Sequence, residues 1–366
     1  MFDGFARAMR FGKAWKLGAP HLREVELELP RSGTAFPATL LMPDAFSDPL
    51  PAWVTLHGIT RPGRTHPTLV RFVRALAAAG YAVLVPEVPE WREMRLVPKE
   101  AADTLRTAAL TLAHREETAE GRVGVMGFSF GGPQALMAGT DPALRPHLKA
   151  VASFGGYCDI EKTLRFLFTG EHEWEGVRYR ADPDPYGRWV AGGNYLSSAP
   201  GYEGTEDVAA ALLLLAREAG DLNVASWDPY HDTRKKELEE SLPPAKREIF
   251  RAFAPVHGEA IPTELVDALV PALARAARQD SPLFDIGALL GDITVPVRLI
   301  HGRQDRLIPF TETLRLAGRF PYGSDVRVFL TDLFSHSQRH GGRLKIRDLA
   351  EQLRFLNLIS VVLGTL

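Results

Sequence analysis

The chain is nearly free of cysteine: among its 366 residues, Cys158 is the single one. One thiol excludes an internal disulfide framework and any zinc or iron–sulfur site built from several cysteines. A secreted protein held together by disulfides is therefore not expected. Cys158 itself is best interpreted as a small core residue, because free cysteine usually packs as a small hydrophobic group.

The sequence also lacks an excess of charge of either sign. Lysine and arginine number 43 against 45 aspartates and glutamates, which gives a net charge of −2. A balanced chain has no overall field that would attract nucleic acid or an anionic membrane, so neither is an expected partner. With 45% hydrophobic residues, the chain has the composition of an ordinary globular protein and can bury a sizeable core.

Long apolar runs are missing as well. Residues 1–15 mix basic and aromatic side chains, without the continuous apolar stretch of a signal peptide, and are expected to form a short amphipathic helix. Residues 353–366 are apolar, but a bilayer crossing needs roughly 20 such residues. We expect a terminal helix packed on the core there. The sequence therefore predicts no membrane span and a cytoplasmic protein.

Short apolar segments typical of strands alternate with segments of helical spacing. The expected strands are residues 25–29, 38–42, 52–56, 81–85, 122–126, 149–154, 295–300 and 325–330. The expected helices between them are residues 67–79, 99–117, 133–138 and 311–319. The first two strands are expected to be antiparallel at an edge. This alternation predicts an α/β fold with a mostly parallel sheet covered on both faces.

The alternation is interrupted between residues 157 and 285. No clear strand pattern occurs there, and helical spacing returns at residues 206–219, 233–240 and 263–277. The density of glycine and proline in residues 187–204 suggests a mobile loop. Length alone predicts about two domains, at roughly 150 residues each. We therefore divide the chain into a first core part, a helical lid and a second core part, which are residues 1–156, 157–285 and 286–366.

A glycine-rich motif stands where one of the expected strands meets a helix. Residues 127–132 read GFSFGG and place Ser129 in the pattern G-x-S-x-G. The flanking glycines leave room on a tight strand-to-helix turn, where larger side chains would collide. A serine on such a turn is exposed at the end of a strand. The context favours a nucleophile over a serine that merely caps the helix.

A serine nucleophile needs a general base, and the base needs an orienting acid. Ligand-facing residues of a parallel sheet lie at the carboxyl ends of its strands. Two such ends offer the missing groups: Asp305 follows strand 295–300, and His336 follows strand 325–330. We predict that Ser129, Asp305 and His336 form a catalytic triad, in the chain order Ser, Asp, His.

Other residues compete for the base and the acid. His340 lies four positions after His336 and is the alternative base. Asp159 and Asp332 are the alternative acids. The two histidines could also face a metal ion together, but no further ligand pattern accompanies them, and we expect no metal.

These motifs, in the order in which they occur, resemble the α/β-hydrolase superfamily. The resemblance covers about residues 20–156 and 285–360. It rests on GFSFGG around Ser129, on His57-Gly58 after the third strand, on VPVRLIHGRQDRLIP around Asp305 and on His336 after the last strand.

The resemblance implies the α/β-hydrolase fold, with about eight strands flanked by helices and a lid inserted after the sixth strand. The doubled glycine after Ser129 is similar to that of dienelactone-hydrolase-like esterases and prolyl-oligopeptidase-like peptidases. Residues 86–91 depart from the pattern, because many relatives carry an acidic, glycine-rich loop there.

By the same resemblance, two backbone N–H groups would form an oxyanion hole. One belongs to Phe130, directly after the nucleophile, and the other to Ile59, after His57-Gly58. Such donors stabilise the negative charge of a tetrahedral intermediate. His57 and His301 each precede a glycine at a strand end, and we expect both to shape loops through hydrogen bonds.

The triad and the resemblance together predict a serine hydrolase that cleaves a carboxylic ester of moderate size, without a cofactor. The expected partner is a small-molecule ester substrate. The sequence leaves a homodimer as an open alternative. An aminopeptidase or amidase of the prolyl-oligopeptidase type is the alternative, in which Glu171 and Glu173 could grip a peptide amine. A second alternative is an acyltransferase that uses the same triad. From a different class, the fold can serve as a ligand receptor with a disabled triad.

Overall fold

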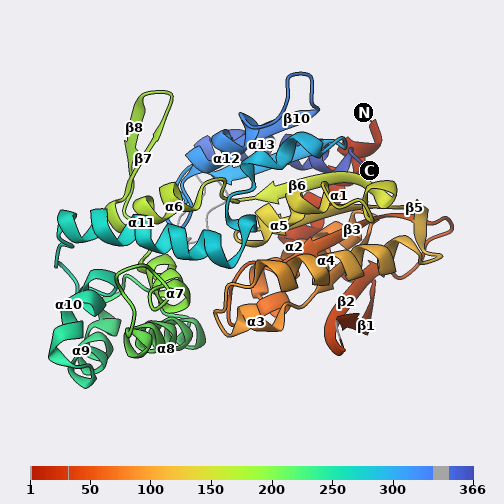
Figure 1. Ribbon diagram of the computed structural model, residues 1–366. Coiled ribbons are helices and arrows are strands. Elements are labelled where there is room, and N and C mark those ends of the chain that lie inside the picture. Colours follow the sequence, from red (N-terminus) through yellow and green to blue (C-terminus); the bar gives the residue numbers. More distant parts are fainter. Residues whose placement is uncertain (1, 32, 333–345) are drawn as a thin grey trace.

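The computed structural model describes residues 2–31, 33–332 and 346–366. His336 and His340 lie outside these residues. The central element is an eight-stranded sheet with the order β1-β2-β4-β3-β5-β6-β9-β10 (Figure 1). Its strands are β1 (Leu22–Arg31), β2 (Thr34–Pro43), β3 (Leu50–Leu56), β4 (Ala82–Pro86), β5 (Thr118–Phe128), β6 (Leu148–Phe154), β9 (Val297–Gly302) and β10 (Val326–Thr331).

The sheet is mostly parallel. Strand β2 pairs antiparallel with both β1 and β4, whereas β4, β3, β5, β6, β9 and β10 run parallel to one another. All eight strands expected from the sequence are present, and the predicted antiparallel pair lies at an edge. Six parallel strands end at the same side of the sheet, which is where the candidate catalytic residues follow β5 and β9.

Helices cover both faces of the sheet, because its strands are apolar on both sides. On β3, Trp53 packs in one hydrophobic cluster, while Val54 and Leu56 belong to the other. The Trp53 face is covered by α1 (Phe2–Leu17), α2 (Pro67–Ala78) and α13 (Ile346–Leu363). The opposite face is covered by α3 (Pro89–Arg92), α4 (Pro98–Ala113), α5 (Gly131–Ala138) and α12 (Phe310–Ala317).

Local sequence signals set several of these helix boundaries. Proline stands at the first position of both α2 and α4, where its missing N–H costs no hydrogen bond. After α2, Gly80 takes a φ of +99°, a conformation that favours glycine and ends the helix. The expected terminal helices are α1 and α13, and they pack together: a Cβ on Gly4 would lie 3.0 Å from the carbonyl oxygen of Ser360.

A second group of elements lies between β6 and β9 in the chain, beside the carboxyl ends of the parallel strands (Figure 1). It comprises α6 (Ile160–Thr169), β7 (Glu171–Trp174), β8 (Val177–Arg180), α7 (Pro185–Tyr195), α8 (Glu206–Leu222), α9 (Asp232–Ser241), α10 (Pro244–Phe253) and α11 (Thr263–Asp280). The three helical stretches expected here correspond to α8, α9 and α11.

Two expectations for this region were wrong. A β-hairpin, β7–β8, projects from it (Figure 1) where no strand was expected; its strands are only four residues long, too short for a clear alternation. The expected loop at residues 187–204 begins as helix α7. Two glycines of this helix serve close packing, because a Cβ on Gly192 would lie 2.6 Å from the Phe253 ring, and one on Gly193 would lie 2.4 Å from Leu213.

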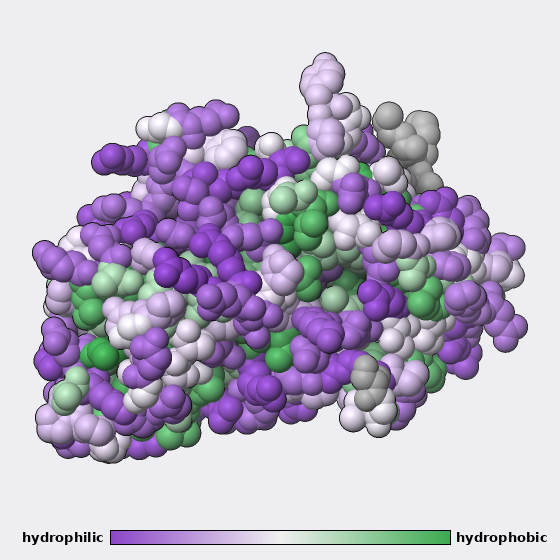
Figure 2. Space-filling view, in the orientation of Figure 1, coloured by the Kyte–Doolittle hydropathy of each residue, from purple (hydrophilic) through white to green (hydrophobic). Residues whose placement is uncertain are grey.

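The surface in view is largely polar, with small apolar patches scattered between charged side chains (Figure 2). Large exposed apolar side chains include Leu17, Val177 and Leu222, and some exposed apolar residues are usual on protein surfaces. None of the helices in the described ranges has the length and apolar character needed to cross a membrane.

Candidate active site

Ser129 occupies a strained turn between β5 and α5. Its φ of +54° lies in the left-handed region, which costs a non-glycine residue on the order of 1 kcal/mol or more. The Ser129 N–H donates to the carbonyl of Phe154 at 2.7 Å, and its own carbonyl accepts from Gly132 N–H at 2.9 Å. These bonds hold the serine at the tip of the turn, as a nucleophile on a strand-to-helix elbow requires.

The glycines of GFSFGG are required because the backbone approaches other atoms too closely to leave room for a side chain. A Cβ on Gly127 would lie 1.9 Å from the carbonyl oxygen of Gly131, and one on Gly131 would lie 2.5 Å from that of His57. A Cβ on Gly132 would lie 2.4 Å from the Ser153 hydroxyl. No side chain fits at these positions, so the turn can be this tight only with glycine.

The loop after β3 passes directly beside the Ser129 hydroxyl. A Cβ on Gly58 would lie 3.1 Å from Ser129 Cβ and 3.7 Å from its Oγ. Ile59 is the next residue of this loop. Within the described residues, neither the Ile59 nor the Phe130 N–H makes a hydrogen bond. Both predicted oxyanion donors are therefore available.

Asp305 lies in the loop that follows β9 and is only 3% exposed. Its Oδ1 accepts hydrogen bonds from the N–H groups of Leu307 and Ile308, at 2.9 and 3.0 Å. Its Oδ2 lies 3.7 Å from His301 Nε2. Two bonds to one oxygen fix the rotation of the carboxylate, which is what an acid needs in order to orient a histidine.

The topology brings Ser129 and Asp305 to one end of the sheet, where strand β10 also ends. Strand β6 separates β5, which leads to Ser129, from β9, which leads to Asp305. Strand β10 lies beside β9 and ends at Thr331, five residues before His336. His336 itself lies outside the described residues, so its assignment remains a prediction.

Known structures share this arrangement of strands and helices. An acylaminoacyl peptidase bound to a chloromethyl ketone aligns over 96% of this chain with a TM-score of 0.52 and 13% identity, although the chain spans only 42% of that peptidase. A bacterial brefeldin A esterase, described as a homologue of human hormone-sensitive lipase, aligns over 98% of this chain and 84% of its own, with a TM-score of 0.50 and 15% identity. The chain has the α/β-hydrolase fold.

Other solved α/β-hydrolases with similar structures include a 2,6-dihydroxy-pseudo-oxynicotine hydrolase, which aligns over 96% of this chain and 71% of its own, with a TM-score of 0.48 and 16% identity. No protein-family model and no curated protein matches the sequence. At these identities the likeness establishes the α/β-hydrolase fold, and the chemistry has to be argued from the residues of this chain.

The alternative acids occupy other positions in the fold. Asp159 caps the N-terminus of α6, where its Oδ1 accepts from the N–H groups of Glu161 and Lys162 at 3.0 and 3.1 Å. Asp332 is exposed, whereas an orienting acid is typically shielded from water. Cys158 is buried, and this burial raises the pKa of its thiol to about 12. It is therefore protonated at neutral pH and a poor nucleophile.

The two histidines at strand ends shape their loops, as expected. The ring of His301 bonds to the Thr313 hydroxyl at 2.6 Å and to the Ile308 carbonyl at 2.9 Å. The ring of His57 lies 2.7 Å from the Gly58 carbonyl and accepts from the Val88 N–H at 3.1 Å. In the part of the chain that the structure describes, no group of three or more His, Cys, Asp and Glu side chains could hold a metal ion.

Aromatic side chains surround Phe130, the residue after the nucleophile. Its ring lies 5.5 Å from that of Trp91 and 5.8 Å from those of Tyr157 and Phe284. Tyr157 and Phe284 stand at the two ends of the segment predicted as a lid. The segment therefore joins the α/β-hydrolase core next to the elbow.

A buried carboxylate missed by the sequence analysis fastens one end of this segment. Glu312 of α12 is fully buried, and its Oε2 accepts from the N–H groups of Cys158 and Asp159 at 3.0 and 2.8 Å. Burial raises the pKa of Glu312 to about 7. No sequence signal could have identified it, because a glutamate in the first turn of a helix is usually exposed.

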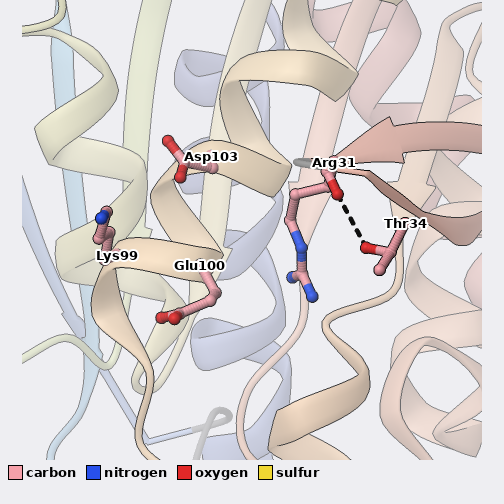
Figure 3. A pocket seen from close by; sticks show the side chains of 5 residues that line it. All are labelled: Arg31, Thr34, Lys99, Glu100 and Asp103. Atoms are coloured by element: carbon pink, nitrogen blue, oxygen red, sulfur yellow. Dashed lines mark hydrogen bonds between the residues drawn. The ribbon is translucent and has the colours of Figure 1, made fainter.

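A surface cleft of about 290 Å³ is lined by Arg31, Thr34, Lys99, Glu100 and Asp103 (Figure 3). These residues come from the β1–β2 hairpin and the start of α4, and none of them belongs to the elbow or its neighbouring loops. The Arg31 guanidinium donates to Thr104 and pairs with Glu90. The cleft is therefore separate from the candidate active site of the α/β-hydrolase fold.

Proposed function

We propose that the protein is a serine hydrolase that cleaves a carboxylic ester of moderate size. One observation carries the proposal: Ser129 stands in a left-handed elbow with the Gly58–Ile59 loop beside its hydroxyl. One esterase and one peptidase among the similar folds agree with a hydrolase. A receptor with a disabled triad would not require a strained serine next to two available N–H donors.

In the proposed reaction, Ser129 Oγ attacks the ester carbonyl carbon while its proton passes to the His336 imidazole. The carbonyl oxygen becomes an oxyanion, which the Phe130 and Ile59 N–H groups stabilise. The C–O bond then breaks as His336 returns the proton to the leaving alcohol. Water attacks the acyl-enzyme with His336 as base, and the acid leaves. Asp305 orients the imidazole throughout.

We also propose that residues 157–285 act as the lid of this site. Tyr157 and Phe284, at its ends, contact Phe130, which supports a pocket of apolar character near the nucleophile. A lid that excludes water would favour transfer of the acyl group to an alcohol, which is the acyltransferase alternative.

The test is hydrolysis of p-nitrophenyl esters, from acetate to palmitate, at pH 8 by wild type and Ser129→Ala. We expect kcat to fall by on the order of 10⁴-fold or more in the variant. Ser241→Ala is the matched control, because its hydroxyl only bonds the Leu238 carbonyl at the end of α9, and it should retain full activity.

Near-normal turnover by Ser129→Ala would refute the mechanism. Activity on peptide amides or anilides in place of esters would favour the aminopeptidase alternative. Products formed with added alcohol instead of water would favour the acyltransferase. Ligand binding without turnover in wild type would favour the receptor.

A further inference from the structure

The loop that presents Ile59 is barely tied to the sheet through its backbone. Among the described residues, residues 58–65 form hydrogen bonds between two backbone groups only within this segment or to His66. Gly63 N–H donates to Thr60, Thr65 N–H to Pro62 and His66 N–H to Gly63. An oxyanion donor must nevertheless be held in place for catalysis. The position of the loop therefore depends on side chains around it.

One buried carboxylate touches both ends of this loop. Glu87 follows β4, is 3% exposed, and is anchored by its own N–H, which donates to Pro37 at 2.8 Å. Its Oε1 lies 2.9 Å from His57 Nε2, at the beginning of the loop. Its Oε2 accepts from the Arg64 N–H at 3.4 Å and lies 3.8 Å from Arg64 Nε, at the far end.

The backbone of the loop also packs against this carboxylate. Gly63 has a φ of +58°, and a Cβ there would lie 2.2 Å from Glu87 Oε1. The His57 ring, which Glu87 contacts, lies 2.7 Å from the Gly58 carbonyl through Nδ1. His57 Nε2 also lies 3.1 Å from the backbone nitrogen of Val88. The contacts therefore run from Glu87 through His57 to the residue that precedes Ile59.

We expect the fold to gain little stability from this carboxylate, because only one of its two oxygens accepts a hydrogen bond. Glu87 Oε1 makes no hydrogen bond within the described residues. Removing a carboxylate from water costs free energy that incomplete pairing does not recover. A neutral group of the same size should therefore leave the stability unchanged or raise it. A role of Glu87 in placing the loop can thus be separated from a role in folding.

We propose that Glu87 is a positioning residue that holds the loop of residues 57–65, and with it the Ile59 N–H, beside Ser129. The proposal rests on the proposed function for its effect on catalysis. Its effect on the loop is independent of that function. Glu87 acts through His57 and Arg64 and does not touch the reacting atoms.

The test compares Glu87→Gln with wild type in two measurements. In ester hydrolysis, kcat should fall by on the order of 10-fold to 100-fold with KM nearly unchanged, because a misplaced oxyanion donor weakens binding of the transition state alone. In hydrogen–deuterium exchange, a peptide covering residues 57–66 should exchange several-fold faster. The melting temperature should stay the same or rise.

Glu90→Gln is the matched control. Glu90 lies three residues further on, is also a partly buried carboxylate, and pairs with Arg31 away from the loop. It should leave both kcat and the exchange of residues 57–66 unchanged. Glu87→Leu removes the acceptor of the Arg64 N–H as well as the charge, so it should raise the exchange of residues 57–66 at least as much as Glu87→Gln.

The proposal would be overturned if residues 57–66 of the Glu87→Gln variant exchanged at the wild-type rate, or if the kcat of the variant were unchanged. A lower melting temperature with KM and kcat affected equally would also overturn it, because Glu87 would then be a structural residue. If wild type hydrolyses no ester, the proposed function fails, and the exchange of residues 57–66 still decides whether Glu87 positions the loop.

Discussion

At the scale of single residues, Asp305 and Asp159 show how the backbone decides what a carboxylate can do. Both follow a parallel strand of the sheet, and both accept two backbone N–H groups through Oδ1. Asp305 is buried at the edge where β9 ends, whereas Asp159 begins helix α6 and is used as its cap. Sequence position alone could not separate the two.

We predict that Asp305→Asn lowers kcat by on the order of 10⁴-fold, as expected when a triad histidine is held in the wrong tautomer. The amide oxygen can still accept from Leu307 and Ile308, so the amide nitrogen then faces the base as a donor. The melting temperature should change little. Steady-state kinetics on the preferred ester and a thermal melt measure both effects.

Asp159→Asn provides the comparison, because asparagine also caps helices well. It should retain kcat within a few-fold. A large loss of kcat in Asp159→Asn, together with near-normal activity in Asp305→Asn, would reverse the assignment of the acid.

At the scale of elements, α12 is tied to the start of α6 by one side chain. Glu312 accepts from the N–H groups of Cys158 and Asp159, and Arg315 donates to its other oxygen at 3.0 Å. The carboxylate is buried where the proposed lid leaves the sheet. Its protonation state therefore affects how firmly the lid is attached.

Burial raises the pKa of Glu312 from 4.5 to about 7 in the folded protein. A raised pKa means that the folded state holds the proton more tightly than the unfolded state. The stability that this adds is complete below pH 4.5 and is lost as the pH rises through about 7. We expect Glu312→Gln to remove this dependence, which is worth on the order of 3 kcal/mol.

The measurement is the free energy of unfolding in urea at pH 5 and pH 8, for wild type and Glu312→Gln. The wild type should lose more stability than the variant between the two pH values. Glu161→Gln controls for charge changes in the same region, since Glu161 is half-buried and pairs with Arg278 away from Glu312. Parallel pH dependence in wild type and Glu312→Gln would contradict the shifted pKa.

The elements that the sequence predicted well are those with a strong periodic signal. The inner strands β3, β4, β6 and β9 are apolar runs buried on both faces, which leaves such runs few alternatives. Helix α7 was missed because Gly192 and Gly193 are typical of loops, and their reason is the close approach of Phe253 and Leu213. Tertiary packing of that kind leaves no local signal.

The residues of the candidate site also differ in how far the sequence could predict them. The elbow position of Ser129 could be predicted because the elbow requires glycines at fixed positions. Asp305 could be predicted only as one of the acids that follow a strand end, and its burial distinguishes it in the fold. Glu87 and Glu312 could not be given roles, since their partners are 30 residues away, at His57, or more than 150, at Cys158. Roles that depend on distant partners become visible only in the fold.

At the scale of the whole molecule, the proposed lid and the sheet share one hydrophobic core. A single cluster of buried residues includes Val54 and Val125 of the sheet together with Trp189 and Leu212 of the segment between β6 and β9. Phe284, fully buried, joins the two, because its ring contacts Phe130 and also lies 5.4 Å from Tyr195.

A shared core predicts that the two parts unfold together. In hydrogen exchange at increasing urea concentrations, peptides from α7 and α8 should lose protection at the same midpoint as peptides from β5 and β6. Phe284→Ala should lower both midpoints equally, with a loss of about 3–5 kcal/mol, as for other large-to-small changes in a core. Leu222→Ala, at an exposed site, should shift neither.

Separate midpoints, with the helices losing protection first, would mean that the lid is an independent unit resting on a stable core. In that case Phe284→Ala would shift the lower midpoint alone. Coincident midpoints would instead mean that the lid cannot open by unfolding, so that substrate must enter through smaller movements of the lid. The stability of the shared core thus determines how the proposed site can be reached.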